Sequence, residues 1–210
     1  MRTRVGVTAL AGAMLLAVGL AAGPSAAATA GTWTVRPGGA VAAKAGKTTL
    51  TDTTLNSTLT CLSATMTGAL KAGSGVPGAG IGSITAAAFT CHELLPVKLT
   101  ALGLPWRLNL SSYDRRSGVA RGTVSHLRLS FVGPACTVQV NGTSGTSANG
   151  VVAVSYSDGH GKLTFLPAGG NLHWFHVKGC GGLLGNGDPA VLGAAYAISP
   201  PQVITSPSTR

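Results

Sequence analysis

The chain has 210 residues, a length that fits one domain or two small ones. Only 10% of the residues are charged, and 15 Lys and Arg against 5 Asp and Glu give a formal charge of +10. Apolar residues make up 45% of the chain and recur in periodic runs, which excludes a disordered protein. The scarcity of Glu, Gln and Lys disfavours surface helices and favours strands joined by turns.

The first 30 residues follow the pattern of a secretory signal peptide. Arg2 and Arg4 precede an uncharged apolar run over 5–22, which small residues follow. We expect cleavage after Ala28, or alternatively after Ala30, so that residues 1–28 are a signal peptide. An uncleaved membrane anchor is the alternative, because about 18 apolar residues can span a bilayer. Since Arg2 and Arg4 each carry one charge, cleavage lowers the formal charge from +10 to +8.

The four cysteines of an exported chain meet an oxidising compartment and are expected to pair. Four cysteines allow three connectivities. We predict Cys61–Cys91 and Cys136–Cys180, because each pair flanks its own strand-rich segment. The alternative is a metal site, but neither a C-x-x-C nor an H-x-x-x-H spacing supports one.

Short strand candidates and turn signals alternate from residue 31 onward. Residues 40–47 are small and basic and show no clear period, and the glycine-rich 73–82 predict a loop. Ile84, Ala86 and Ala88 are expected to share one strand face. The strands expected before residue 105 cover 31–36, 59–70, 84–91 and 97–101.

Residues 105–131 predict an antiparallel hairpin. Trp106, Leu108 and Leu110 alternate with polar neighbours, as in a strand with one solvated face, and 127–131 repeat this pattern. The polar segment 111–118 predicts the connecting loop.

The second arm of this hairpin changes phase. Val124 falls on one face of the strand, whereas Leu127 and Leu129 fall on the other. A β-bulge produces such a one-residue slip, and we place it near Ser125.

The rest of the chain predicts further strands and a tail. Asp158-Gly159 lies between two strand patterns and predicts a tight hairpin, and Pro200-Pro201 introduces a polar C-terminal tail over 201–210. The later strands are expected over 136–140, 151–156, 163–166, 172–177 and 191–198. About ten strands at short spacing predict one all-β domain over 29–200, an antiparallel β-sandwich or partly closed barrel with two disulfides.

No arrangement of residues in the sequence predicts a catalytic, cofactor-binding or metal site. Three-residue spacing places His173 and His176 on opposite faces of a strand, which disfavours a shared metal. The few acidic residues occur mainly in turn contexts and do not indicate the facing carboxylates of a glycosidase. The glycine-rich 73–82 lack the Lys-Ser/Thr of a phosphate-binding loop.

The basic excess suggests a binding surface instead. Arg107, Arg121 and Arg128 are expected on the outer face of the central hairpin, where they would attract anionic polymers in a salt-dependent way. The alternative is that these charges serve only solubility. Nucleic acid is not an expected partner, because the sequence lacks an aromatic stacking platform.

Four phrases together resemble a group of small secreted actinobacterial proteins of unassigned function. They are WTVRPGG at 33–39, GVPGAGIGSITAAAFTC at 75–91, LPWRLNLSSYD at 104–114 and GNGDPAVL at 185–192. The resemblance implies an exported β-rich domain with paired cysteines, and it supplies no catalytic residue. His92 and Glu93 after Cys91 depart from the small turn residues expected there.

These observations favour an exported, non-catalytic β domain that associates with the cell envelope or another anionic extracellular partner, with no cofactor. We expect it to be secreted, either released or held at the cell wall, with no transmembrane segment after cleavage. One alternative is a secreted hydrolase with a Ser/His/Asp site, which requires at least three such residues within hydrogen-bond reach. The other is a small-molecule carrier that uses the interior of a barrel.

Overall fold

The computed structural model describes residues 32–92 and 96–206, and within them it contains sixteen β-strands and one 3-10 turn, η1 (Asp158–His160). The proposed signal peptide lies outside the described residues. The first eight strands are β1 (Thr32–Arg36), β2 (Gly39–Ala45), β3 (Thr48–Asp52), β4 (Ser57–Cys61), β5 (Ser63–Leu70), β6 (Gly73–Pro77), β7 (Gly82–His92) and β8 (Pro96–Leu102). The other eight are β9 (Trp106–Asp114), β10 (Val119–Gly133), β11 (Cys136–Asn141), β12 (Gly150–Ser157), β13 (Lys162–Phe165), β14 (His173–Lys178), β15 (Ala190–Ser199) and β16 (Val203–Thr205).

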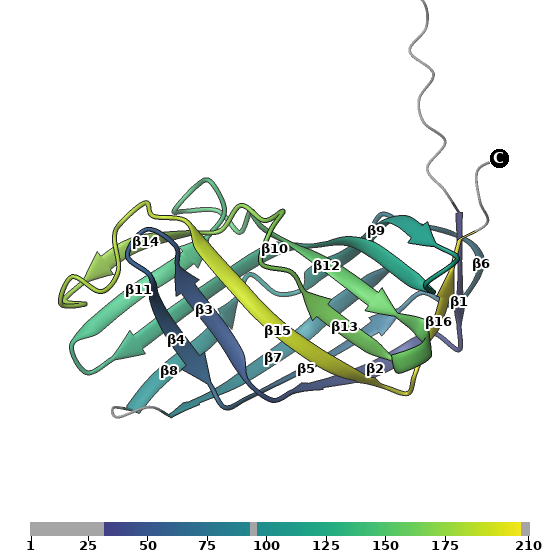
Figure 1. The fold of residues 1–210 in the computed structure, drawn as a ribbon, viewed down its shortest axis with the longest axis horizontal. Helices are drawn as coiled ribbons and strands as arrows, with labels where there is room; N and C mark the ends of the chain where they lie inside the picture. Colours follow the sequence, from purple (N-terminus) through teal and green to yellow (C-terminus); the bar gives the residue numbers. More distant parts are fainter. Residues whose placement is uncertain (1–31, 93–95, 207–210) are drawn as a thin grey trace, which may run out of the picture.

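Eight of these strands form a closed antiparallel barrel (Figure 1). Its order is β2-β5-β7-β9-β10-β12-β13-β15, and the pairing of β15 with β2 closes it. Alternate residues point inward, so buried and half-buried residues alternate strictly over the eight residues of β12. The predicted all-β class is therefore confirmed, with closure as a barrel and not as a sandwich.

The strands of the barrel continue beyond it at one end and carry five further strands, here called the extension. The second half of β10 pairs with β8 and β11, and β11 pairs with β14. The first half of β15 pairs with β3, which pairs with β4. β10 spans 15 residues, which lets one strand serve both parts of the molecule.

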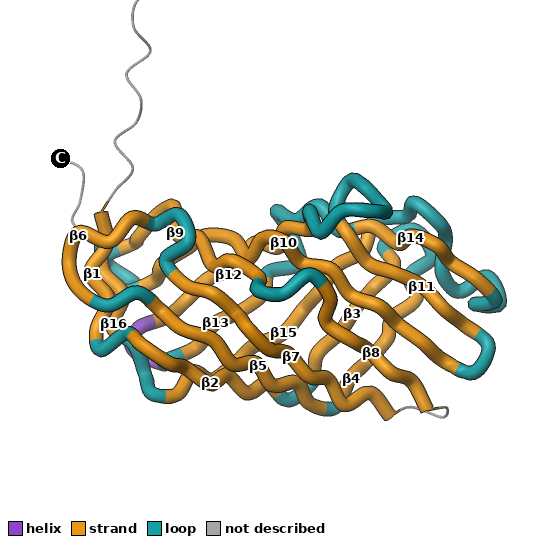
Figure 2. Tube along the Cα trace, turned by 180° about the vertical axis from the view of Figure 1, so that it is seen from behind, coloured by secondary structure: helices purple, strands orange, loops and turns teal. Residues whose placement is uncertain are grey.

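A separate three-stranded sheet, β16-β1-β6, lies at the other end and is called here the cap sheet. Figures 1 and 2 both show β1, β6 and β16 at one end of the elongated molecule and β11 and β14 at the other. Trp33, Val35, Val76 and Ile204 of this sheet are buried and belong to the same hydrophobic core as the barrel. The cap sheet therefore covers this end of the barrel.

The predicted central hairpin is confirmed as β9 and β10, with a turn shorter than the expected loop. The predicted bulge is confirmed as well. The pairing of β10 with β12 shifts between Ser125 and Leu127, and His126 between them has a φ of 65°. The extra residue restores Leu127 and Leu129 to the inward face, where both are fully buried.

The strand expected over 59–70 is in fact two strands, β4 and β5, and three further expectations were wrong. Residues 40–47 contain most of β2, although their small side chains give no periodic signal. The expected glycine-rich loop contains β6, which pairs with β1. Ala86 and Ala88 are exposed, because a register shift between Thr67 and Gly68 changes the phase of β7.

The expected polar tail is also corrected. Residues 203–205 form β16, and Ile204 is buried against the barrel. The side chain of Gln202 is fully buried, with its Oε1 accepting from the Gly38 amide at 2.9 Å. Proline pairs usually end regular structure, so the sequence pattern did not indicate that the chain turns back to pair with β1.

Both predicted disulfides are confirmed, and the described residues contain no free cysteine. Cys61–Cys91 joins β4 to β7, and Cys136–Cys180 joins β11 to the loop after β14. Cys136–Cys180 therefore lies in the extension, whereas Cys61–Cys91 ties the extension to the barrel strand β7.

Candidate functional site

The outer face of β9 and β10 brings two predicted arginines onto one wall of the barrel. Arg107 lies opposite Ser125 in the ladder between these strands, and Arg121 lies opposite Ser112. Both arginine side chains are exposed, since their neighbours Trp106, Leu108 and Ala120 fill the barrel interior. The wall therefore presents two guanidinium groups to solvent from adjacent strands.

Arg128 has a different role from the other two arginines. Its side chain is half-buried, and Nη2 donates to Oε1 of Gln139 at 2.7 Å. Nη1 donates to the carbonyl oxygen of Thr146 at 3.4 Å. Arg128 thus connects β10 to β11 and to the loop before β12, and it adds charge to the wall without being open to a ligand on all sides.

Lys71 is a further cation at this wall, and the sequence pattern does not predict its place there. Lys71 and Arg107 line the same groove, which has a volume of about 470 Å³. Asn109 shapes the groove, because its Oδ1 accepts from the Gly80 amide at 2.8 Å and its Nδ2 donates to Ser125 Oγ at 3.1 Å. Lys71 follows β5, whose Leu70 pairs with Gly82 of β7, and β7 in turn pairs with β9, so two ladders bring Lys71 beside Arg107. No local sequence signal indicates that contact. We call Lys71, Arg107, Arg121 and Arg128 the basic wall.

The turn after β9 places further charge at one end of the basic wall. Arg115 and Arg116 are exposed in this turn. Asp114 accepts hydrogen bonds from Ser117 Oγ at 2.7 Å and from the Arg116 amide at 2.9 Å, and these bonds lower the pKa of its carboxyl below 3.8. This carboxylate is thus engaged in shaping the turn.

Two further carboxylates are occupied by structural hydrogen bonds. Asp158 Oδ1 accepts from the Ile204 amide at 2.9 Å, and Oδ2 accepts from Tyr113 Oη at 3.3 Å. Asp52 is fully buried and accepts from the amides of Thr54, Leu55 and Gly185. These acids stabilise turns and strand ends.

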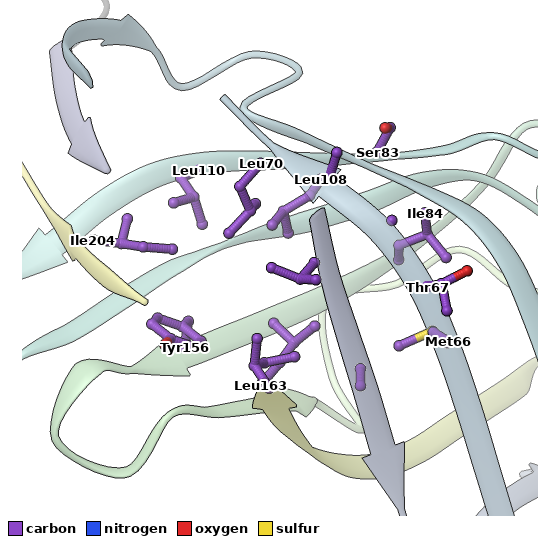
Figure 3. A pocket seen from close by; sticks show the side chains of 15 residues that line it. Met66, Thr67, Leu70, Ser83, Ile84, Leu108, Leu110, Tyr156, Leu163 and Ile204 are labelled. Carbon is purple, nitrogen blue, oxygen red and sulfur yellow. The ribbon is translucent and has the colours of Figure 1, made fainter. Parts of the chain in front are cut away.

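The interior of the barrel is nearly filled by side chains. Figure 3 shows the interior cavity, which has a volume of about 50 Å³ and is lined mainly by apolar side chains such as Met66, Leu108 and Leu163. Tyr156 also lines this cavity, and its hydroxyl donates to the carbonyl oxygen of Gln202 at 2.7 Å and accepts from the Gln202 amide at 3.0 Å. Pockets for small organic ligands usually measure about 300–1,000 Å³, so this interior does not offer a carrier site.

The nearest approach to a hydrolase site is a serine beside a histidine. Ser125 Oγ lies 3.2 Å from Nδ1 of His126, and Asn109 also contacts this hydroxyl. Within the described residues no hydrogen bond joins a carboxylate to His126, and the ring is exposed on the bulge. This pair lacks the orienting group and the enclosed setting that an activated nucleophile requires.

The two histidines of β14 are held by different loops. His173 Nδ1 lies 2.9 Å from the carbonyl oxygen of Asn171, whereas His176 Nε2 lies 3.3 Å from that of Gly145. Across residues 32–92 and 96–206, no three side chains of His, Cys, Asp or Glu are arranged to hold a metal ion.

No helix in the described part of the chain has the length and apolar character needed to span a membrane. Comparisons with protein-family models, with curated proteins and with solved structures found no match for this chain.

Proposed function

We propose that this protein is an exported, non-catalytic β domain that binds anionic polymers of the cell envelope through the basic wall. The observation that carries the proposal is the exposure of Arg107 and Arg121 on adjacent strands, with Lys71 in the neighbouring groove. The charge of the nearby Asp114 interacts with Arg121, but a single carboxylate offsets only one of the cations at this wall.

A repeating polyanion fits this surface better than a single small anion. One exposed ion pair contributes only about 0–1 kcal/mol, so an isolated anion would bind weakly. A polymer engages several cations in turn, and each further contact then forms at high effective concentration. Binding of this kind depends steeply on salt, because the charges are solvent-exposed.

The two disulfides support a place outside the cytosol, since such bonds persist mainly in oxidising compartments. The apolar N-terminal run with its small-residue cleavage site supports export. The positive charge of the basic wall favours retention of the protein at the anionic cell wall over release.

The test removes charge from one side of the barrel at a time. The variant Arg107→Ala/Arg121→Ala is compared with Lys44→Ala/Lys162→Ala, which has the same net charge. Lys44 and Lys162 are exposed and pair with Ala197 of β15 from its two sides. They therefore lie on the side of the barrel opposite β9 and β10. Retention on purified actinobacterial cell wall is measured at increasing ionic strength.

We expect the arginine variant to bind purified cell wall roughly threefold to thirtyfold more weakly than the wild type at low salt. The lysine variant should bind within about twofold of the wild type, because its charges face away from the ligand. Equal losses in the two variants would show that only net charge matters. That result, or no retention of the wild type at low ionic strength, contradicts the proposal.

A further inference from the structure

The outer face of the extension carries a polar groove with a volume of about 380 Å³. It lies over β10, β11 and β14 and is lined by Ser130, Thr137, Val138, Gln139, His176 and Lys178. Val138 is buried, so the side chains that the groove offers to solvent are polar. None of the lining residues is acidic, and Lys178 is positively charged at neutral pH. The groove therefore suits a polar ligand with negative charge.

The register of the strands places these side chains next to one another. Ser130 pairs with Gln139 in the ladder of β10 and β11, and Thr137 pairs with Lys178 in the ladder of β11 and β14. Both pairs lie on the outer face, because Val138 between Thr137 and Gln139 points into the core. Neighbouring strands lie about 4.8 Å apart, so hydroxyl, amide and ammonium groups follow one another over about 10 Å.

The side-chain amide of Gln139 has a fixed orientation in this groove. Nη2 of Arg128 donates to its Oε1 at 2.7 Å. Because a guanidinium group only donates, this bond identifies the oxygen end of the amide and leaves Nε2 as a donor for a ligand. Within the described residues, no hydrogen bond engages this Nε2, the hydroxyls of Ser130 and Thr137 or the ammonium group of Lys178. These four groups are therefore available to a ligand.

A strained bulge shapes one side of the groove. The pairing of β11 with β14 shifts between Thr137 and Gln139, so β14 carries one extra residue here. His176 at this bulge has a φ of 54°, which residues other than glycine seldom adopt. Its ring is exposed, and Nε2 lies 3.3 Å from the carbonyl oxygen of Gly145. Bulges redirect side chains, and backbone strain of this kind concentrates at binding sites.

The composition of the groove distinguishes between classes of anionic ligand. β11 is paired on both sides, so the groove offers side chains and no free strand edge for an extended peptide. A compact phosphate group is usually held by converging guanidinium or backbone N–H groups, whereas the cation in this groove is the single ammonium of Lys178. An acyl chain would find no apolar lining. A sugar chain presents hydroxyls that donate and accept along its length, and it matches a row of hydroxyl and amide groups.

We propose that this groove binds an acidic oligosaccharide, whose sugar rings carry both hydroxyls and a carboxylate. The sugar hydroxyls exchange hydrogen bonds with Ser130, Thr137 and Nε2 of Gln139, and one carboxylate lies beside Lys178. The groove lies on the extension, whereas Arg107 and Arg121 lie on the barrel, so this site does not depend on the function proposed for the basic wall.

The experiment is an NMR titration of the isotope-labelled protein with trigalacturonate, a short chain of sugar acids, and with its methyl ester. The ester keeps the ring hydroxyls and lacks the charge. The two glutamines of the chain supply an internal control. The side-chain amide of Gln139 lines the groove, whereas Gln202 is fully buried at the other end of the molecule. Trigalacturonate should shift the side-chain signals of Gln139 and leave those of Gln202 unchanged.

Four variants test the groove, and circular dichroism verifies that each is folded. Thr137→Trp fills the groove from an exposed strand position, and Ser130→Ala/Thr137→Ala removes two hydroxyls. Lys178→Ala removes the charge of the groove. Lys98→Ala is the control of equal net charge: Lys98 is also exposed but does not line the groove. It pairs with Val132, which pairs with Thr137, so Lys98 lies two strands away from β11.

We expect Thr137→Trp to bind trigalacturonate at least about tenfold more weakly than the wild type. Loss of the two hydroxyls should weaken binding of the acid and of the ester alike, roughly threefold to thirtyfold. At about 0.15 M salt, Lys178→Ala should weaken binding of the acid roughly twofold to fivefold and leave binding of the ester unchanged. Lys98→Ala should match the wild type, because a charge about 10 Å from Thr137 is screened at this ionic strength.

Undiminished binding of trigalacturonate by a folded Thr137→Trp protein would overturn the oligosaccharide site. So would the absence of shifts at Gln139, or equal losses in Lys178→Ala and Lys98→Ala. Equal affinity for the acid and the ester would contradict an acidic ligand, and displacement of trigalacturonate by an equal concentration of inorganic phosphate would assign the groove to a small anion. The variant Arg107→Ala/Arg121→Ala should bind trigalacturonate normally, so the two proposals fail separately.

Discussion

Asp52 is the only acidic residue among those described whose side chain is fully buried, and its carboxylate organises two segments far apart in sequence. Oδ1 accepts from the amides of Thr54 and Leu55 in the turn after β3, each at 2.9 Å, and Oδ2 accepts from the Gly185 amide. A short acidic side chain satisfies backbone donors in a turn in this way. The bond from Gly185 also holds the loop between β14 and β15 against the turn after β3.

We predict that Asp52→Ala lowers the free energy of unfolding by about 2–4 kcal/mol, because it leaves three backbone amides without their acceptor. Asp52→Asn should cost less, since its remaining oxygen keeps part of the pattern. Asp114→Ala is the matched control, because this exposed acid shapes a turn at the surface and should cost much less than Asp52→Ala. Urea unfolding followed by circular dichroism measures all three. A cost for Asp52→Ala no larger than that for Asp114→Ala would contradict the assignment.

Asp158 and Asp114 have pKa shifts of opposite sign and different causes. Burial raises the pKa of the Asp158 carboxyl above 3.8, against the lowering effect of its hydrogen bonds from Ile204 and Tyr113. The folded state therefore binds this proton more tightly than the unfolded state does. The resulting stabilisation is complete below pH 3.8 and is lost as the pH rises through the raised pKa.

We predict that the stability of the wild type relative to Asp158→Asn falls as the pH rises from about 3 to about 6. For Asp114 the hydrogen bond from Ser117 Oγ lowers the pKa, so its contribution is present above pH 3.8 and is lost as the pH falls through the lowered pKa. The stability of the wild type relative to Asp114→Asn should therefore change in the opposite direction. Unfolding curves at a series of pH values measure both differences, and two slopes of the same sign would refute this account.

At the scale of single elements, β16 shows how a three-residue strand can stabilise a barrel. Its residues pair with β1, and Ile204 packs into the barrel beside Tyr156 and Leu110. Val203 next to it points outward and is 54% exposed, whereas Ile204 is 1% exposed. Adjacent residues of one strand thus provide a test of burial with the backbone held constant.

We predict that Ile204→Ser destabilises the protein by about 2–4 kcal/mol, because it removes a buried side chain and leaves a hydroxyl in an apolar cavity. Val203→Ser should change stability by less than about 1 kcal/mol. Thermal and urea unfolding distinguish the two variants. Equal effects would mean that the cap sheet does not close the barrel in solution.

For the molecule as a whole, the disulfides link strands that the ladders leave incompletely joined. Among the described strands, β4 forms a ladder with β3 alone. On its other side, Cys61–Cys91 and a hydrogen bond from the Leu62 amide to the Thr90 carbonyl oxygen connect β4 to β7. Cys136–Cys180 strengthens an end that is already paired through Thr137 and Lys178. Both bonds therefore secure strands of the extension.

The bonded cysteines are 30 and 44 residues apart, so chain entropy predicts a similar stabilisation of roughly 3–4 kcal/mol from each. We predict that Cys61→Ala/Cys91→Ala costs at least as much as Cys136→Ala/Cys180→Ala, because β4 has no ladder on the side that this bond secures. The urea midpoints of the two double variants measure this order. The prediction fails if the Cys136–Cys180 bond proves the more important, or if neither removal shifts the midpoint.

Local pattern predicted the elements whose apolar residues are large and regularly spaced. The alternation around Trp106 and the phase change near Ser125 identified β9, β10 and the bulge, because a buried face imposes a period of two on the chain. The disulfide pairs followed from the same segmentation. Strands β2, β3 and β6 were missed, since alanine, threonine and glycine contribute little to an apolar pattern. These segments form strands because neighbouring strands pair with them.

The sequence by itself determined the all-β class, the cysteine pairing and the exposure of Arg107 and Arg121, because each depends on side-chain chemistry and near neighbours along the chain. Only the tertiary structure decided barrel closure, the return of β16, the placement of Lys71 beside Arg107 and the polar groove of the extension. These features depend on pairing between segments far apart in the sequence. The hydrogen bonds of a strand ladder join backbone groups and depend little on the side chains. The pattern of one strand therefore does not specify which distant strand it joins.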